Sequence, residues 1–216
     1  MQYRISMSYQ KIFNYHFSPR KNNENYFVNQ TNQKAYDLTI LEEFNHNIFL
    51  FGPKKSGKSH LVSLWKHKND AILYNNNFSE IIETKKNVAI DDILGSSSEE
   101  NIFHLINHCK LHNLKMYFTS SLDINDYDFK FKDLHSRLKE FVYLEINSPD
   151  DEMCKMLLVK LFYDKQIIIK NKEIFDFIFK RLSRSYLDIY IFVEKLDRLS
   201  LVKKRQLTIP LIKEII

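Results

Sequence analysis

The sequence predicts an α/β domain built on a five-stranded parallel sheet, followed by a small all-α domain. Three observations support this prediction. Five short apolar runs alternate with segments of helical spacing, an order typical of parallel sheets. The first run leads directly into the pattern G-x-x-x-x-G-K-[ST] at residues 52–59. The last run ends before Asn147-Ser148-Pro149, and every segment after this break has a helical pattern without glycine.

The expected strands and helices follow one another along most of the chain. Strands are expected at residues 47–51, 71–74, 87–93, 115–121 and 141–146. Helices are expected at residues 31–44, 60–67, 98–110, 150–163, 172–182 and 185–202, with a short helix ending near Ile82 and another opened by Pro210. We therefore divide the chain into an N-terminal arm (1–24), an α/β domain (25–148) and an all-α domain (149–216).

The pattern at residues 52–59 is the main candidate site, because it is typical of a loop that binds the phosphates of a nucleotide. Its glycines let backbone N–H groups point at phosphate oxygens, and the following helix adds a partial positive charge. The candidate nucleotide-binding residues here are Pro53, Lys54, Lys55, Ser56, Gly57, Lys58, Ser59 and His60. We expect Lys58 to contact the β and γ phosphates and Ser59 to bind Mg²⁺. A basic turn with two chance glycines is the alternative, and the strand, loop and helix in this order argue against it.

Polar side chains follow two further strands of the expected sheet. Asp91 and Asp92 come after apolar residues 88–90, and the run at 115–121 ends in hydroxyls. Because the carboxyl ends of parallel strands border the ligand crevice, Asp91 is expected to hold Mg²⁺ together with Ser59. Asp92 is the candidate base for an attacking water, and Thr119 or Ser121 is expected to bond the γ-phosphate or that water. Apolar runs that end in Asp also occur as ordinary strand-to-turn caps.

Composition excludes some classes of protein and leaves others open. The net charge of +5 is compatible with a nucleic-acid or acidic partner, but it carries little weight because abundant Lys also accompanies AT-rich coding. Cys109 and Cys154 lie in expected helices without metal-ligand spacing, which favours buried thiols and a reducing compartment. No apolar run approaches the roughly 18 residues of a membrane span, and the first residues lack a signal-peptide core. The expected location is the cytoplasm.

Three other segments have both a functional and a structural interpretation. His104, His108 and His112 share one helix face, but no carboxylate or cysteine completes a metal-ligand set there. Gln10–Tyr15 can be a short motif that docks in a partner's groove, or apolar side chains that pack on their own domain. Residues 26–28 can pack on a base, although single aromatic residues are more often part of a core.

The order of these features resembles the AAA+ ATPases of the DnaA/Hda family. The resemblance rests on the phosphate loop, the Asp-Asp strand at 90–93, the Thr-Ser-Ser strand, Ser136-Arg137-Leu138 and the Pro-Asp-Asp string at 149–151. Residues 25–28 with 32–35 resemble the adenine-side segment of that family, and residues 205–214 resemble the end of its lid. The match runs from about Tyr26 to the last residue. The chain ends where a DNA-reading helix-turn-helix domain would begin in DnaA, which favours the Hda branch.

The resemblance implies roles for individual residues. ATP or ADP with Mg²⁺ would be the ligands, with Tyr26, Phe27 and Val28 on the adenine side. Arg137 matches the arginine finger, which stabilises charge on a neighbour's γ-phosphate and contributes about 10³–10⁵ in rate. Leu187 stands where the family has a nucleotide-sensing lid arginine, with Arg184 out of register, which implies weak coupling and slow intrinsic hydrolysis. Gln10–Tyr15 occupies the place of the clamp-binding motif, although its Lys and Asn depart from that pattern.

The leading functional expectation is an adenine-nucleotide-binding regulator of chromosomal replication initiation. It would stimulate hydrolysis of DnaA-bound ATP and act with the DNA polymerase sliding clamp, with no membrane association and no sequence-specific DNA binding; a homodimer is compatible with the pattern. A self-assembling Mg²⁺-dependent ATPase is the first alternative, with Asp92 as base and Arg137 acting in a sister subunit. A DnaA-like adaptor that binds single-stranded DNA or a DNA-bound protein is the second.

Overall fold

A computed structural model describes most of the 216-residue chain. It covers residues 26–41, 46–96, 98–169, 171–203 and 208–215. The Gln10–Tyr15 segment, with its expected role in clamp binding, lies outside the described residues. No helix in the described ranges is long and apolar enough to cross a membrane.

The sheet has five parallel strands, as the sequence predicts. They are β1 (Ile48–Phe51), β2 (Ile72–Leu73), β3 (Val88–Ile90), β4 (Met116–Ser120) and β5 (Val142–Glu145). Their spatial order is β2-β3-β4-β1-β5, and every neighbouring pair is parallel. All five carboxyl ends therefore meet at one edge of the sheet, where β1 runs into the phosphate loop beside the ends of β4 and β3.

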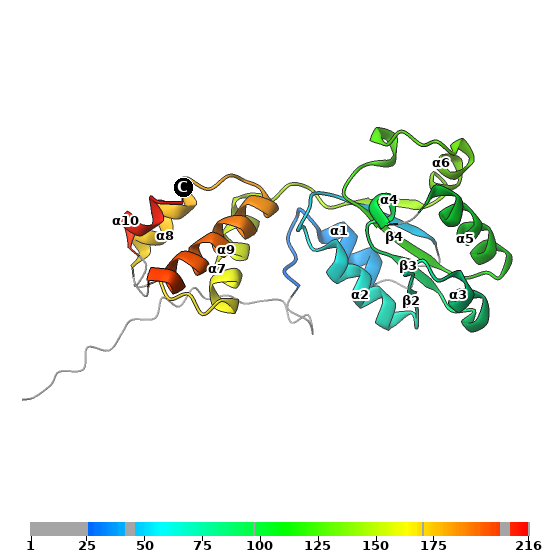
Figure 1. The fold of residues 1–216 in the computed structure, drawn as a ribbon, viewed down its shortest axis with the longest axis horizontal. Coiled ribbons are helices and arrows are strands. Elements are labelled where there is room, and N and C mark those ends of the chain that lie inside the picture. The colour runs from blue at the N-terminus through cyan, green and yellow to red at the C-terminus, as the bar shows by residue number, and fades with distance from the viewer. Residues whose placement is uncertain (1–25, 42–45, 97, 170, 204–207, 216) are drawn as a thin grey trace, which may run out of the picture.

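Helices cover both faces of this sheet (Figure 1). On one face lie α1 (Gln33–Tyr36) and α2 (Lys58–Lys68), and on the other lie α3 (Phe78–Thr84), α5 (Glu99–Leu111) and α6 (Lys132–Leu138). Successive residues of β1 are buried on opposite sides, since Phe49 packs with α5 and Leu50 packs with α2. Burial on both faces explains why the strands appear in the sequence as continuous apolar runs.

Three expected elements differ from the structure in extent. The strand expected at 87–93 ends at Ile90, because Asp92 takes a left-handed backbone (φ 55°) and accepts a hydrogen bond from Gly95 N, which opens the short helix α4 (Ile93–Ser96). Only Ile72 and Leu73 are paired in the strand expected at 71–74. The helix expected at 31–44 is α1 followed by a π-helical turn at Asp37–Leu41.

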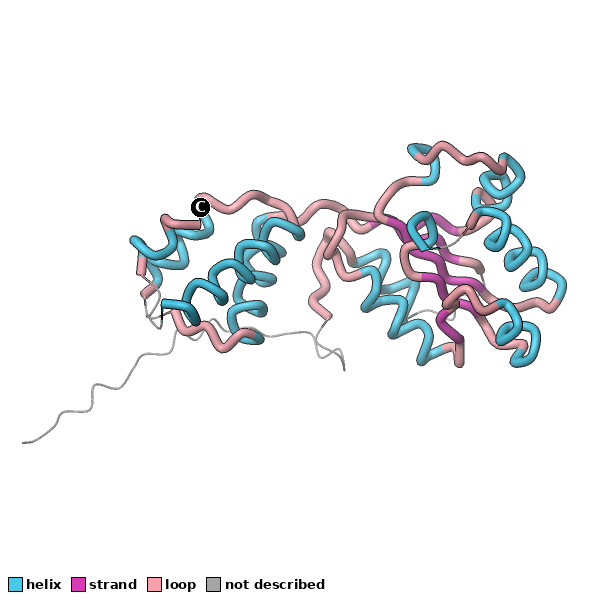
Figure 2. The backbone as a smooth tube through the Cα atoms, viewed as in Figure 1, coloured by secondary structure: helices cyan, strands magenta, loops and turns pink. Residues whose placement is uncertain are grey.

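The C-terminal part of the chain is all helical and has its own apolar core. It comprises α7 (Asp151–Asp164), α8 (Lys172–Phe179), α9 (Tyr186–Lys203) and α10 (Ile209–Ile212). Leu158, Ile178, Phe192 and Leu196 are among the buried side chains that pack these helices together. Figure 2 shows the helical unit joined to the sheet by the loop after β5. The expected fold class, a five-stranded parallel sheet followed by a small all-α lid, is confirmed.

Asp150 ties the start of this helical unit to the segment at residues 26–32. Its carboxylate caps α7 by accepting a hydrogen bond from Met153 N (2.7 Å), and it also accepts from Asn29 Nδ2 (3.0 Å) and Gln30 Nε2 (2.8 Å). Burial raises the pKa of the Asp150 carboxyl. The hydrogen bonds lower it by more than burial raises it, so the pKa lies below its ordinary value. The charged form of Asp150 is therefore the one that stabilises the junction.

We expect Asp150→Ala to lower the free energy of unfolding by about 1–2 kcal/mol at pH 7, because it removes a helix cap and two side-chain bonds. A group with a depressed folded pKa contributes stability above its unfolded pKa of about 3.9 and loses it as pH falls through the folded value. The difference between the two proteins, measured by thermal or urea unfolding, should therefore shrink below about pH 4. Glu152→Ala removes an exposed carboxylate from the same first turn and serves as the control. Equal losses in both variants would contradict a specific role for Asp150.

Candidate functional site

The loop between β1 and α2 has the tight backbone that a phosphate-binding loop requires. Gly57 has a φ of 97°, and a Cβ atom there would lie 2.8 Å from Cε2 of Tyr26. Only glycine combines this left-handed conformation with so close an approach. Ser56 N donates to Pro53 O (3.3 Å), which closes a turn inside the loop, and α2 begins directly afterwards at Lys58. The first N–H groups of an 11-residue helix therefore point toward the loop.

Lys58 is held at the centre of the loop. Its side chain is 8% exposed, and Nζ donates to Gly52 O and Pro53 O, both at 2.8 Å. Burial lowers the pKa of this ammonium, while the negative charges of Asp91 and Asp92 raise it in part. An ammonium has three N–H donors, so these two bonds leave one for an anionic oxygen. Both carboxylates at the end of β3 therefore favour the charged form of Lys58.

Thr119 joins the end of β3 to β4. Its hydroxyl, fully buried, donates to Asp91 Oδ1 (2.7 Å) and accepts from Asp92 N (2.9 Å). The Asp91 carboxylate is thereby fixed in orientation, whereas the Asp92 carboxylate is exposed beside Gly95, where an added Cβ would lie 2.8 Å from Asp92 Oδ2. Since the Thr119 proton is engaged by Asp91, Ser121 is the hydroxyl at this strand end that stays available for a ligand. Ser121 is partly exposed.

Ser59 and Asp91 carry oxygen donors of the kind that Mg²⁺ prefers. Ser59 is exposed on the first turn of α2, and the half-buried Asp91 offers its second carboxylate oxygen. A hydroxyl and a carboxylate suit a hard cation that keeps several waters and bridges to a phosphate. The donor set therefore fits Mg²⁺ in the presence of a nucleotide. Among the described residues, no group of three or more His, Cys, Asp and Glu side chains forms a metal site by itself.

The aromatic segment before α1 lies against the loop. Tyr26 is buried, with its ring stacked on Tyr36 (5.8 Å, 11°) and edge-on to His60 (5.3 Å), and its hydroxyl accepts from Asn32 Nδ2 (3.2 Å). Burial raises the pKa of Tyr26 well above its ordinary value. Tyr26 therefore supports the loop at Gly57, while the side chains of Phe27 and Val28 remain partly exposed.

Lys55 connects the loop to the lid. Its Nζ lies 5.4 Å from the ring centroid of Tyr190 in α9, a cation–π contact that the sequence does not indicate. Leu187 is partly exposed one turn earlier. Arg184 is committed elsewhere: it donates to Asp151 Oδ1 (2.7 Å) and to two backbone carbonyls of the lid. The arginine nearest to the expected sensor position is thus used to hold the lid together.

Arg137 belongs to α6. This helix packs on α5 at the end of the sheet domain away from the lid (Figure 1), whereas Lys55 of the phosphate loop contacts Tyr190 of the lid. The Cζ atom of Arg137 lies 5.2 Å from the ring centroid of Phe103. No acidic side chain in the described ranges lies within ion-pair distance of Arg137. The structure therefore brings together the loop, Asp91, Asp92 and Tyr26, and it places Arg137 apart from them.

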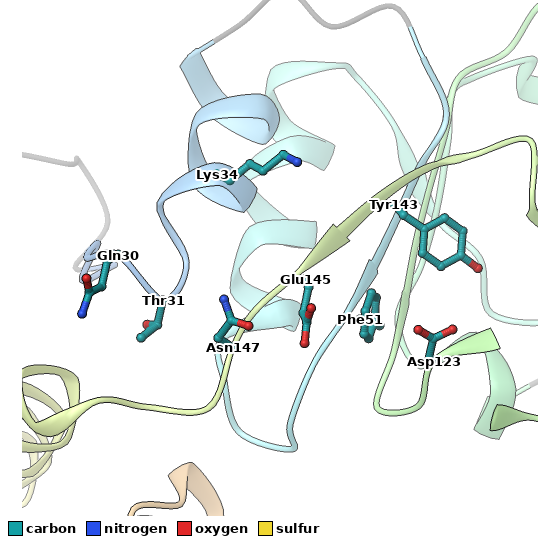
Figure 3. A pocket seen from close by; sticks show the side chains of 8 residues that line it. All are labelled: Gln30, Thr31, Lys34, Phe51, Asp123, Tyr143, Glu145 and Asn147. Atoms are coloured by element: carbon teal, nitrogen blue, oxygen red, sulfur yellow. The ribbon is translucent and has the colours of Figure 1, made fainter. Parts of the chain in front are cut away.

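A separate hollow of about 420 Å³ lies at the ends of β1 and β5 (Figure 3). It is lined by Gln30, Thr31, Lys34, Phe51, Asp123, Tyr143, Glu145 and Asn147. The hydroxyl of Tyr143 is buried without a hydrogen-bond partner among the described residues, and burial together with Asp123 raises its pKa. No residue of the phosphate loop lines this hollow.

The chain is similar to known proteins in its lid and over most of its length. Residues 158–216 match the model of the Hda lid domain. The chain is 24% identical to the chromosomal replication initiator DnaA of Buchnera aphidicola subsp. Cinara cedri, over 89% of this chain and 51% of that protein. It thus spans about half the length of this DnaA. It is also 26% identical to an uncharacterised Haemophilus influenzae protein, over 78% of this chain and 80% of that one.

Solved structures of DnaA share the fold. Domain III of Thermotoga maritima DnaA superposes with a TM-score of 0.68 at 18% identity, over 89% of this chain and 95% of that one. AMPPCP-bound DnaA from Aquifex aeolicus gives a TM-score of 0.62 at 19% identity, over 82% of this chain and 64% of that one. With the Hda lid match and the strand order around the phosphate loop, these likenesses show an AAA+ fold that is similar to that of the DnaA/Hda family.

Proposed function

We propose that this protein is an adenine-nucleotide-binding regulator of chromosomal replication initiation, which stimulates hydrolysis of ATP bound to DnaA. The observation that supports this most directly is the placement of Arg137. A cation without an acidic partner in the described part of the chain, on a face remote from its own phosphate loop, suits a nucleotide held by another subunit.

The phosphate loop would bind ATP or ADP in this protein itself. Lys58 would contact the β and γ phosphates, and Ser59 with Asp91 would hold Mg²⁺, which neutralises charge on the phosphates when bound. Phe27 and Val28, which lie partly exposed beside the loop, would line the adenine side. The Aquifex aeolicus DnaA that shares this fold was solved with AMPPCP, which supports an adenine nucleotide as the ligand.

The bound nucleotide would act as a conformational signal rather than as a rapidly consumed substrate. Asp92 and Ser121 offer a base and a hydroxyl for slow intrinsic hydrolysis. The lid, however, contacts the loop through Tyr190 and Lys55, and its Arg184 is occupied within the lid. A change at the phosphates would therefore reach the lid through Lys55.

DnaA would be the partner that receives Arg137, as the similarity of this chain to DnaA and of its lid to that of Hda suggests, and the protein would act together with the sliding clamp. The clamp contact is proposed for Gln10–Tyr15, outside the described residues. We also propose a cytoplasmic location, because DnaA and the sliding clamp both work on the chromosome.

One observation favours a second function. Each chain carries both a phosphate loop with Asp92 and an arginine without an acidic partner in the described ranges, so two copies could complete each other's sites. The protein would then be a self-assembling Mg²⁺-dependent ATPase, with a homodimer as its smallest unit.

Phosphate release from DnaA preloaded with radioactive ATP tests the first function and separates it from the second. We expect release to accelerate when the protein is added with clamp-loaded DNA, and the protein alone to show slow turnover per chain at every concentration. Absence of any acceleration would refute the proposed function. Turnover of the protein alone that rises steeply with its concentration would establish the self-assembling ATPase instead.

A further inference from the structure

The helix that carries Arg137 is held by the first turns of α5. Glu99 accepts a hydrogen bond from Phe131 N (2.7 Å) through Oε2 and from Lys130 N (3.3 Å) through Oε1. These two backbone groups immediately precede α6. Glu99 therefore fixes the point at which α6 begins, but it does not determine where the Arg137 side chain lies at the other end of that helix.

Phe103, one turn after Glu99, reaches both ends of α6. Its ring packs edge-on against Phe131 (5.3 Å between centroids, 61°), and the Arg137 guanidinium lies over it (5.2 Å to the centroid). Phe103 is only partly buried and lies at the margin of the core on this face of the sheet. Its contacts with both Phe131 and Arg137 distinguish it from the fully buried residues of α5, such as Ile102 and Leu105.

An aromatic ring holds an arginine in a way that an acidic residue cannot. The ring attracts the guanidinium through its negative π face and engages none of the five N–H donors. An ion pair would hold the side chain as well, but it would neutralise the charge and occupy the fork that recognises phosphate. Since no carboxylate in the described ranges pairs with Arg137, both its charge and its donors stay available.

We propose that Phe103 is the positioning residue for Arg137, holding its guanidinium extended so that it enters a partner's nucleotide site without first being ordered. This inference rests on the proposed function for its consequence in catalysis, but the positioning itself is a property of this chain. A leucine or methionine at position 103 would fill similar space without a π face, so α6 would keep its place while Arg137 lost its platform. A tyrosine would keep the platform.

Single-turnover hydrolysis of DnaA-bound ATP, measured over a range of regulator concentrations, tests the proposal through two parameters. We expect Phe103→Leu and Phe103→Met to lower the maximal rate roughly fivefold to tenfold, while the half-saturating concentration and the melting temperature stay close to those of the wild type. Phe103→Tyr should retain the wild-type rate. The proposal would be overturned if Phe103→Tyr lowered the maximal rate as much as Phe103→Leu does. It would also be overturned if Phe103→Leu and Phe103→Met changed only the half-saturating concentration.

A measurement that does not involve DnaA keeps this inference separate from the proposed function. The Arg137 Nε–H signal, identified by its loss in Arg137→Ala, should be shifted by the ring current of Phe103 in the NMR spectrum of the wild type. It should move toward the position of a solvent-exposed arginine in Phe103→Leu and stay in Phe103→Tyr. An unmoved signal in Phe103→Leu refutes the positioning role. If the signal moves in Phe103→Leu but Arg137→Ala still stimulates hydrolysis of DnaA-bound ATP, the proposed function is refuted and the positioning role is not.

Discussion

Replacing Lys58 with alanine is expected to weaken the binding of ATP and ADP by about 100-fold or more. The ammonium is buried in the loop, where two carbonyl oxygens hold it and one donor remains for a phosphate. Hydrogen bonds to charged groups contribute about 1.5–3 kcal/mol each, and tenfold in affinity corresponds to about 1.4 kcal/mol. The loss of this bond, together with the positive charge itself, in a partly desolvated site therefore accounts for this effect. Titration with a fluorescent ATP analogue, or calorimetry, measures it directly.

The controls for this variant come from the same helix. Lys66→Ala removes the same charge two turns later in α2 and should leave nucleotide affinity within about twofold, since a charge this distant is screened by salt. Lys58→Ala should also stay folded, because burial already lowers the pKa of this ammonium and its removal abolishes a desolvation cost. An unchanged affinity in a folded Lys58→Ala protein would show that the loop does not bind nucleotide.

The fold was predictable because its signals are local. Parallel strands covered on both faces appear as short apolar runs, and β1 illustrates this with Phe49 and Leu50 buried on opposite sides. The Pro149 break marks the change from strands to helices. Strand ends were less predictable: Ile93 suits a strand by composition, but the left-handed backbone of Asp92 turns the chain into α4 before that residue.

The features of the site that the sequence did not predict are contacts between residues far apart in the chain. The link from Thr119 to Asp91 depends on the register of β3 against β4, which pairs Ile90 with Phe118 and cannot be deduced from either strand alone. The sequence analysis made Thr119 a candidate ligand of the γ-phosphate. In the structure its hydroxyl donates to Asp91 and orients that carboxylate. No periodicity distinguishes Phe103 from other apolar residues of α5, so its place under Arg137, 34 positions later, required the structure.

The contact between the lid and the phosphate loop differs from the one that the sequence predicts. The resemblance to the DnaA/Hda family implies a sensor position at Leu187, with Arg184 nearby. In the structure Arg184 donates to Asp151 and to two lid carbonyls. The contact that does reach the loop has its cation on the loop, at Lys55, and its aromatic ring on the lid, at Tyr190. A pattern that requires the cation on the lid therefore does not predict this contact, because here the lid supplies the aromatic ring and the loop supplies the cation.

Arg137→Ala is expected to lower stimulation of DnaA-bound ATP hydrolysis by about 10³-fold, the lower end of the range for arginine fingers. The residue has no acidic partner in the described ranges and stacks on Phe103 at the margin of the core, so its removal should change the free energy of unfolding by less than about 1 kcal/mol. Binding of nucleotide by the protein itself should be unaffected, because α6, the helix that carries Arg137, packs on α5 at the end of the sheet domain away from the lid.

Arg137→Lys and Lys139→Ala make this prediction sharper. Lysine keeps the charge but lacks the planar fork that matches phosphate oxygens, so Arg137→Lys should recover only a small part of the lost rate. Lys139 is exposed at the end of the same helix, and its replacement by alanine changes net charge equally while it should leave stimulation intact. Equal effects of Arg137→Ala and Lys139→Ala would mean that the charge of this face attracts DnaA in general.

A loss that is confined to Arg137→Ala, and that lowers the maximal rate without raising the half-saturating concentration, would have a different meaning. It would assign the effect of Arg137 to the transition state of ATP hydrolysis in the partner. The reason is that only an interaction absent from the ground state lowers the rate without weakening association.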